Sequence, residues 1–476
     1  MSEMNRSHDG VAWGIPQAGE RGGQSTPTLR RLGIGNPLPT FVIGALAYIA
    51  ALAAAVVVIV SVVLAVLTTE VPSTPAGTGP MGGPSAPDAG FGQILGLLGI
   101  PFQLVSMAAF GSYGVDISLG FLGSATMTWR GLPLLVTAVM AGNAFLAAML
   151  VQRRLGTGRW GSNGPLGAFL WSGISGLAVA ILAVIITRLT AFGGHDDELG
   201  MSISMHSAGI DMFVGTWALI TIPLFLGHLA GMVKPRWWPA VADLAAAPRL
   251  ALVHALTFAI PVAAVGMLAG AINLLMNGQG RSILTLLLLL PAGGLNALAT
   301  LPGLGMLTVP LHVNIRGDVS DLGLERTNEF LWFFDLPWYV WIAMLLFGLL
   351  ALLVVPLLWN HDRHIEKGNM LAQVVSWLAL PSAYFVCSLV LLALVWTDVS
   401  VDMGMLGDFA VSYGLAAWMP LVAFFLGAMV ELLARFAAPF VDRFIPGVLV
   451  NWFRRTDRPR RSAAAAAPAP GTPSAP

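Results

Sequence analysis

Four aspartates recur in the chain in a similar local setting. Each lies in a short hydrophobic segment, expected to be extended, that precedes a long apolar stretch with a proline near its start; they are Asp116, Asp211, Asp321 and Asp402. If the four segments lie at one face of a membrane, their carboxylates could ring a common opening and bind a cation through oxygen ligands. The alternative is structural, because aspartate stabilises turns and helix N-termini. The pattern has no ligand spacing of its own, so the structural interpretation is favoured.

The histidines give two further candidate sites. The acidic run at 195–198, followed by His206, is dense in metal-ligand types, but its spacing matches no catalytic metal pattern and is typical of a solvated loop. His228 and His254 lie near the same end of two consecutive apolar stretches, where they could share a proton or a metal ion. Hydrogen bonding within a helix bundle is the alternative for this pair, and it is the favoured one.

Several kinds of chemistry are excluded. The chain has no GxxxxGK[ST] loop, no HExxH helix and no GxSxG elbow. Its single cysteine, Cys387, excludes an intrachain disulfide and a CxxC metal site. Charge is absent near the centre of every apolar stretch, and Glu431 lies close enough to an end to reach the headgroups. We expect Asn143, Asn273 and Asn296 to hydrogen-bond between helices, and we expect neither enzymatic activity nor a cofactor.

The composition identifies the surroundings of these residues. Of 476 residues, 56% are hydrophobic and 10% are charged, and the mean hydropathy is +0.78. Soluble globular chains carry about 25% charged residues, so this chain cannot cover a water-facing surface. It is therefore expected to be a polytopic membrane protein whose main partner is the lipid bilayer. Its formal net charge of +0 gives no electrostatic case for nucleic acid.

Eight stretches are long and apolar enough to cross a bilayer as helices, which takes about 20 residues. They are 41–68, 132–151, 165–192, 212–233, 250–276, 338–359, 371–396 and 410–434. Two more segments, 91–113 and 283–308, contain helix breakers, among them Pro101 in the first and Pro291 in the second. Irregular backbone is tolerated at membrane depth only inside protein or facing a cavity. The predicted fold is an all-α polytopic transmembrane helix bundle of 8 spans with two broken or re-entrant segments; the alternative is 10 spans.

The distribution of Lys and Arg favours the eight-span topology. In that topology the internal loops place 8 basic residues inside and 5 outside, whereas ten spans give 5 inside and 8 outside. Both tails are then cytoplasmic. The chain has only two lysines among its 24 basic residues and is rich in alanine, glycine and proline, which is typical of a GC-rich bacterial genome. We therefore expect a multi-pass protein of the bacterial plasma membrane.

The aspartate segments divide the chain into two similar halves. The predicted divisions are a disordered cytoplasmic tail at 1–40, bundle halves at 41–240 and 241–453, and a basic, low-complexity disordered tail at 454–476. An even number of spans per half makes the halves parallel, whereas five spans per half makes them inverted, as in one class of secondary transporters. Broken helices at matching places in two halves are also a pointer to a transport site.

The chain resembles hydrophobic multi-spanning proteins of actinobacteria. The likeness is carried by the broken segment from Leu290-Pro291 to Gly303 and by the span entry Gly131-Leu132-Pro133-Leu134-Leu135. It is to streptophobe family proteins and a cell-division-associated relative. This resemblance implies a compartment and a fold class only, and no functional residue is carried over.

Two functions lead from the sequence, and a membrane-embedded enzyme comes third. The first is a non-catalytic scaffold for envelope or division machinery, with other membrane or envelope proteins as partners. The second is a transporter or channel for a small or lipidic solute, with its site built by the broken segments near Pro101 and Pro291. The absence of catalytic motifs and of charge at mid-span favours the first. The oligomeric state is left open.

Overall fold

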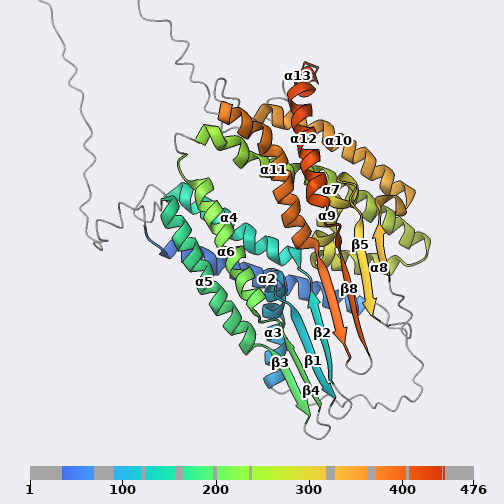
Figure 1. The fold of residues 1–476 in the computed structure, drawn as a ribbon. Coiled ribbons are helices and arrows are strands. Elements are labelled where there is room, and N and C mark those ends of the chain that lie inside the picture. The colour runs from blue at the N-terminus through green and yellow to red at the C-terminus, as the bar shows by residue number, and fades with distance from the viewer. Residues whose placement is uncertain are drawn as a thin grey trace, which may run out of the picture.

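The computed structural model has long helices at one end and a single β-sheet at the other (Figure 1). It describes residues 35–68, 91–119, 124–155, 164–196, 201–234, 238–317, 327–362, 370–403, 407–441 and 443–444. Within these ranges, nine helices are long and apolar enough to cross a membrane, as expected of an integral membrane protein. The predicted C-terminal tail lies outside the described part, as does the predicted N-terminal tail up to residue 34.

The long helices follow the predicted spans. They are α2 (Leu38–Thr68), α4 (Leu134–Leu155), α5 (Pro165–Leu189), α6 (Ile210–Gly231), α7 (Trp238–Met276), α10 (Trp338–Asp362), α11 (Met370–Val395) and α12 (Met419–Phe436), followed by the short α13 (Ala438–Val441). The ninth helix long enough to cross is the stretch Gly280–Met306, and α3 (Phe91–Ala108) is shorter. The largest differences are at two N-termini. Helix α7 begins at Trp238 rather than 250 and passes through Pro248 and Pro261. Helix α12 begins at Met419 rather than 410, because the preceding residues form a strand.

The two segments with helix breakers remain helical. Pro101 lies inside α3. The second segment is divided into α8 (Gly280–Leu289), the π-helix η2 (Leu290–Gly294), α9 (Leu295–Leu301) and the π-helix η3 (Pro302–Met306). Proline has no N–H to donate, and wider π turns at Pro291 and Pro302 accommodate it without ending the helix.

The sheet corrects the predicted all-α class. Its eight strands are β1 (Tyr113–Leu119), β2 (Ser124–Arg130), β3 (Phe192–Asp196), β4 (Met201–His206), β5 (Leu311–Gly317), β6 (Asn328–Leu331), β7 (Thr397–Asp402) and β8 (Asp408–Leu415). All pairs are antiparallel, and the order is β3-β4-β1-β2-β7-β8-β5-β6. The strands are short and lie between the spans, where hydropathy gives no strong signal.

Alternation along the strands gives the sheet an apolar and a polar face. Val115 lies opposite Met127 and Met205, and Met127 lies opposite Val401, so these side chains share one face. The apolar face also carries Tyr113, Ile117, Trp129, Leu311, Ile315, Val399, Val411 and Tyr413. The polar face carries Asp116, Thr126, Thr128, Ser204, His206, Asn314, Arg316, Asp398, Ser400, Asp402 and Ser412.

The order of elements in residues 38–231 recurs in residues 238–436. Each part has a long helix, a second helical segment, a hairpin, two helices, a second hairpin and a last helix. Within the sheet, β3-β4-β1-β2 of the first part are followed in the same sense by the corresponding strands β7-β8-β5-β6. The parts meet at β2 and β7, where the pairing runs from Thr126↔Asp402 to Arg130↔Asp398.

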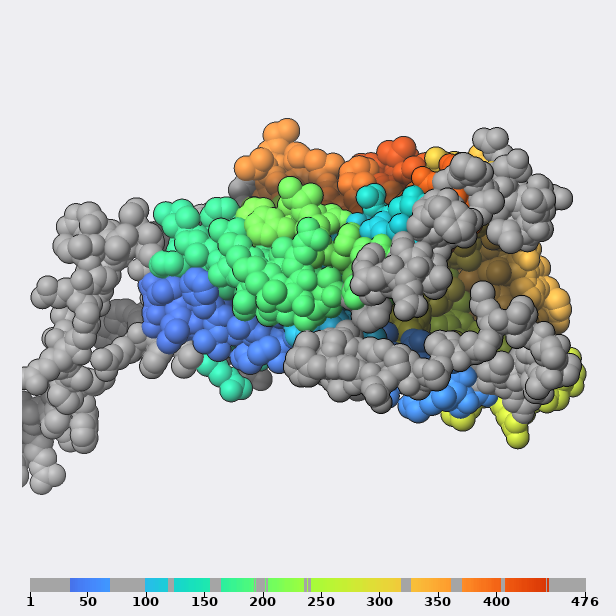
Figure 2. All heavy atoms as spheres, turned by 90° about the horizontal axis from the view of Figure 1, so that it is seen from below, coloured from blue at the N-terminus to red at the C-terminus, as the bar shows by residue number. Residues whose placement is uncertain are grey.

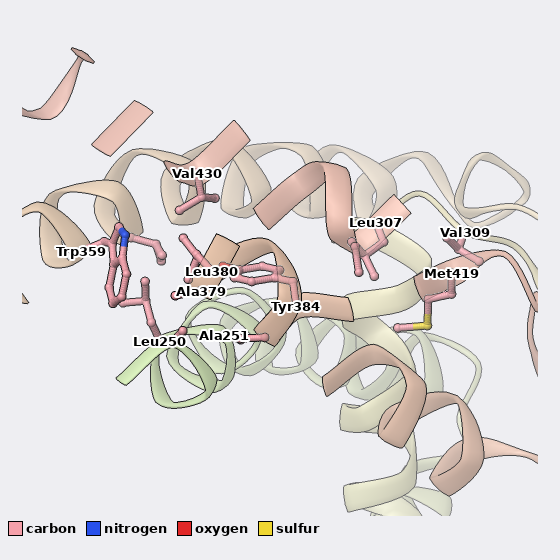
Figure 3. Close-up of a cluster of buried hydrophobic side chains, with 14 of the residues drawn as sticks. Leu250, Ala251, Leu307, Val309, Trp359, Ala379, Leu380, Tyr384, Met419 and Val430 are labelled. Carbon is pink, nitrogen blue, oxygen red and sulfur yellow. The ribbon is translucent and has the colours of Figure 1, made fainter. Parts of the chain in front are cut away.

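Each part also has its own buried core. In the second, Trp359, Leu380, Tyr384 and Val430 from α10, α11 and α12 form one buried cluster with Leu250 of α7 (Figure 3). In the first, the core lies between α2, α4 and α6, with side chains from α3 and α5.

Glycines permit close helix packing in the first part. A Cβ on Gly215 of α6 would lie 1.9 Å from the carbonyl oxygen of Ala109, whereas a Cβ on Gly142 of α4 would meet nothing within 4 Å. We expect Gly215→Ala to destabilise the protein by about 1–3 kcal/mol, because α6 must move away from the end of α3. Gly142→Ala is the matched control and should be neutral or stabilising by up to about 1 kcal/mol. Thermal unfolding of the detergent-solubilised proteins measures both, and equal effects would contradict the packing.

Candidate functional site

A cavity of about 520 Å³ lies where the sheet meets the helices. It is lined by Val58, Val62, Leu104, Met107, Trp129, Gly131, Leu132, Pro133, Ala292, Gly293, Asn296, Ala297, Thr300, Leu311, Val395, Thr397 and Tyr413. These residues come from both parts of the chain, and they include members of β2 and β7, the two strands that join the parts. The cavity therefore lies at the junction of the two parts.

Both helix-breaker segments contribute to this cavity. Leu104 and Met107 follow Pro101 in α3, and Ala292 and Gly293 follow Pro291 in η2. The prolines themselves are not among the lining residues. The sequence interpretation proposed a site near these prolines, and the structure brings their neighbourhoods to one cavity.

Asn296 holds the second-part segment against the first part. Its amide Nδ2 donates to the carbonyl oxygen of Leu132 at 2.7 Å, and its Oδ1 accepts from the backbone N–H of Leu134 at 3.2 Å. This is the bonding between helices that was expected of the three asparagines. Asn143 instead donates to Val139 O within α4, and Asn273 Oδ1 accepts from Asn277 Nδ2 just beyond the end of α7.

The lining of the cavity is mainly apolar. None of the lining residues is charged, and its polar groups are Asn296, Thr300 and Thr397 together with the tips of Trp129 and Tyr413. A largely apolar wall with a few polar groups is typical of a small-molecule site. Gly293 has open space around it, because a Cβ there would meet nothing within 4 Å. The arrangement can hold an apolar molecule with a small polar end.

The cavity adjoins the apolar face of the sheet. Trp129, Leu311 and Tyr413 line the cavity and lie at the helix-proximal end of that face. Farther along the strands, side chains of the same face are only half-buried; they include Val115, Met127, Val399, Val401 and Val411. Tyr113 donates from its Oη to the Sδ of Met205 at 3.3 Å, and burial raises the pKa of the Tyr113 phenol, which keeps it a neutral donor.

Two of the four predicted aspartates lie in one row on the polar face. Asp116 and Asp402 are both paired with Thr126 of the strand between them, so roughly 10 Å separates their backbones. Asp116 accepts from Ser204 Oγ at 3.4 Å, and its Oδ2 lies 3.7 Å from His206 Nε2. The expected extended segments are thus present at these two positions.

Asp211 has the structural role that the sequence analysis gave as the alternative to cation binding. It lies in the first turn of α6, where its Oδ1 accepts from the N–H of Met212 and its Oδ2 from the N–H and Oγ of Ser112. The expected extended segment around Asp211 is therefore wrong. Asp321 lies outside the described residues. A fourfold carboxylate ring is not assembled from Asp116, Asp211 and Asp402.

His228 and His254 have separate partners. The Nε2 of His228 lies 3.3 Å from Thr40 Oγ1, and its Nδ1 lies 3.3 Å from Gln152 Oε1. His254 bonds through Nδ1 to the hydroxyl of Tyr384 in α11. Because both ring nitrogens of His228 are occupied within the first part, the two histidines do not share a proton with each other. Each hydrogen-bonds within its own bundle, which was the favoured interpretation.

A buried ion pair was missed from the sequence. Glu431 is 1% exposed and accepts from Arg435 Nε and from Trp359 Nε1, so it does not reach the headgroups. The Arg435 guanidinium also donates to Ser376 Oγ at 3.2 Å and lies 3.8 Å from the ring centroid of Trp377. The i,i+4 spacing of Glu431 and Arg435 was the available signal.

No known protein helps to assign these features. No family model matches the chain, and no curated protein or solved structure was found to be similar to it. Among the described residues, no group of three or more His, Cys, Asp or Glu could hold a metal ion. Asp197 and Glu198 of the acidic run lie outside those residues. The cavity is therefore the site with the most defined geometry.

The ion pair generates a stability prediction. Arg435→Leu leaves the Glu431 carboxylate buried without its counter-charge, so we expect a loss of about 3–5 kcal/mol. Arg443→Leu removes an exposed arginine just beyond α12 and should change stability by less than about 1 kcal/mol. Thermal unfolding in detergent compares the two variants. Similar unfolding temperatures for the two would show that Arg435 does not compensate the buried charge.

Proposed function

We propose that this integral membrane protein binds a lipid-like solute in the cavity and passes it between the bilayer and the apolar face of the sheet. The observation that carries the proposal is an uncharged cavity of about 520 Å³ at the end of an apolar sheet face. A ligand with an alkyl chain would gain about 0.8 kcal/mol for each methylene group it buries there. Asn296, Thr300 or Tyr413 would hydrogen-bond to its polar end.

The topology that supports this function is one of eight crossings with parallel halves. A sheet with open edges cannot lie in hydrocarbon, so all four hairpins must lie on one side of the membrane. The chain between any two hairpins then crosses an even number of times. Helices α4 and α5 satisfy this rule, as do α10 and α11. Between β4 and β5, α6 and α7 cross, and the helical segment Gly280–Met306 lies along the sheet side without crossing.

Contacts of that segment support the same inference. Thr285 of α8 lies 2.9 Å, Oγ1 to Oγ1, from Thr68 at the C-terminal end of α2. The blue surface of α2 and the yellow-green surface of the α7–α8 region adjoin at the right of Figure 2. Asn296 of α9 bonds to the backbone at Leu132 and Leu134, where α4 begins next to β2. Ten spans with inverted halves would put two hairpins on each side, so the pairing of all four hairpins in one sheet supports the eight-crossing topology.

The charge distribution of the loops supports cytoplasmic termini, which puts the sheet and the mouth of the cavity on the outer side of a bacterial plasma membrane. A membrane-embedded bundle then supplies the lipid, and the sheet supplies an apolar surface outside the bilayer. The residues that line the cavity would bind the solute through their shape and by burying its apolar surface, so no catalytic group is needed. A scaffold for envelope or division machinery is the competing function, and it requires no cavity.

Sided labelling tests the topology. In a Cys387→Ser background, Ser204→Cys on β4 and Asn314→Cys on β5 should react alike with a membrane-impermeant maleimide on intact cells, because both strands belong to one sheet. Lys234→Cys, just after α6 and exposed, should react only after lysis. Reaction of Ser204→Cys and Asn314→Cys from opposite sides would support inverted halves and overturn the eight-crossing topology.

Cavity filling tests the function. In proteoliposomes, a palmitic acid with a photoactivatable diazirine should label peptides that line the cavity, and an excess of unlabelled palmitic acid should compete with this labelling. Gly293→Leu fills the cavity and should reduce labelling of these peptides at least tenfold. Gly142→Leu, at a helical glycine with equal space outside the cavity lining, is the matched control and should not. Equal labelling of both variants would reject the ligand site and favour the scaffold.

A further inference from the structure

We propose that the segment Gly280–Leu301, here called the gate segment, moves to admit the lipid-like solute from the bilayer to the cavity. The inference rests on the proposed function, because it assigns a route of entry to the same cavity. The gate segment consists of α8, η2 and α9, and it supplies to the cavity lining Ala292, Gly293, Asn296, Ala297 and Thr300. Val58 and Val62 of α2 also line the cavity. Movement of the gate segment away from α2 would therefore open the cavity between them.

The gate segment is packed more loosely than the π turn that follows it. Every residue of the gate segment is described and none is buried, with Leu284 at 52% and Leu287 at 49% exposed. In η3, by contrast, a Cβ on Gly303 would lie 2.6 Å from Leu415 Cδ1, and a Cβ on Gly305 would lie 2.5 Å from Phe258 Cζ. The C-terminal end of the gate segment is therefore anchored tightly in the second part of the chain, and the rest of it is not.

The backbone at both ends of the gate segment permits a rotation. Just before α8, Gly278 has a φ of +69°, in the left-handed region, and a Cβ there would meet nothing within 4 Å. Just after α9, Pro302 has no N–H to donate, so one helical hydrogen bond is missing where η3 begins. Hinge motions are usually absorbed by a few residues at the ends of elements, as these are.

Neutral hydrogen bonds hold the gate segment against the first part. Thr68 Oγ1 donates to the carbonyl oxygen of Ala65 at 2.7 Å, so it accepts the hydrogen of Thr285 Oγ1, which lies 2.9 Å away. Asn296 makes a second contact, through its bonds to the backbone of Leu132 and Leu134. Single hydrogen bonds between neutral groups have small net energies. These contacts can therefore favour a closed position and still break to let a solute pass.

A reversible lock tests the gate. In a Cys387→Ser background, Thr68→Cys and Thr285→Cys place two thiols where the hydroxyl oxygens lie 2.9 Å apart, which suits a disulfide. The full chain in proteoliposomes is probed with the palmitic acid that carries a diazirine. When the disulfide is formed before the probe is added, labelling of the peptides that line the cavity should fall at least tenfold from that of the reduced protein. The two single-cysteine variants are the controls, and oxidation should leave their labelling unchanged.

The order of addition distinguishes a gate from a distorted cavity. When the probe is bound first and the disulfide is formed afterwards, the probe should be retained during a chase with excess unlabelled palmitic acid. A disulfide that distorts the cavity would abolish labelling in both orders, and that result would overturn the gate. Equal labelling of reduced and oxidised protein, or failure of the two cysteines to cross-link, would overturn it too and leave the cavity as the ligand site. Absence of labelling in the wild-type protein would instead reject the proposed function.

A second variant tests the gate without a disulfide. Thr285→Val removes the hydroxyl that donates to Thr68 and keeps the shape of the side chain, so labelling should become about fivefold faster. Thr257→Val is the matched control, because the hydroxyl of Thr257 bonds to Val253 within α7. Its labelling rate should equal that of the wild-type protein. Equal rates for the two variants would contradict the closing role of the Thr68–Thr285 contact.

Discussion

The need of every backbone N–H and C=O for a partner sets the architecture of this protein. Helices satisfy that need internally and can cross the bilayer, whereas an open sheet of eight strands cannot. The four hairpins come from distant parts of the sequence, yet they are hydrogen-bonded into one sheet. In the proposed topology the helices between them return to the side they left. That topology has parallel halves and leaves the segment Gly280–Met306 on the sheet side, where it lines the cavity.

The helices were predictable from the sequence, and the sheet was not. A run of apolar residues reports burial in lipid locally, so the span from 165 was placed at the N-terminus of α5, Pro165. The segments around Asp116 and Asp402 were expected to be extended, and both are strands. Their joining depends on β2 meeting β7, far apart in the chain, and no short pattern specifies such a partner. Asp211 has a similar sequence setting but lies in α6, because its carboxylate caps the helix start.

The candidate site was likewise predictable only in part. The prolines indicated where regular helix is interrupted, and the cavity lies next to both interruptions. Their sequence could not show that α3 and η2 meet, because that meeting depends on the sheet junction and on Asn296. Glu431 was missed for a related reason. Its distance from a span end is compatible with the headgroups, and only the position of Trp359 on α10 shows that it is enclosed.

Buried polar groups show how far the structural correspondence between the two parts of the chain extends. Near the sheet-distal ends of α4 and α6, Gln152 and His228 bond to each other; near those of α10 and α12, Trp359 and Glu431 do so. The residue types differ, but each pair ties the same two helices together at the same end. The correspondence thus includes how the bundles are held, as well as the strand order.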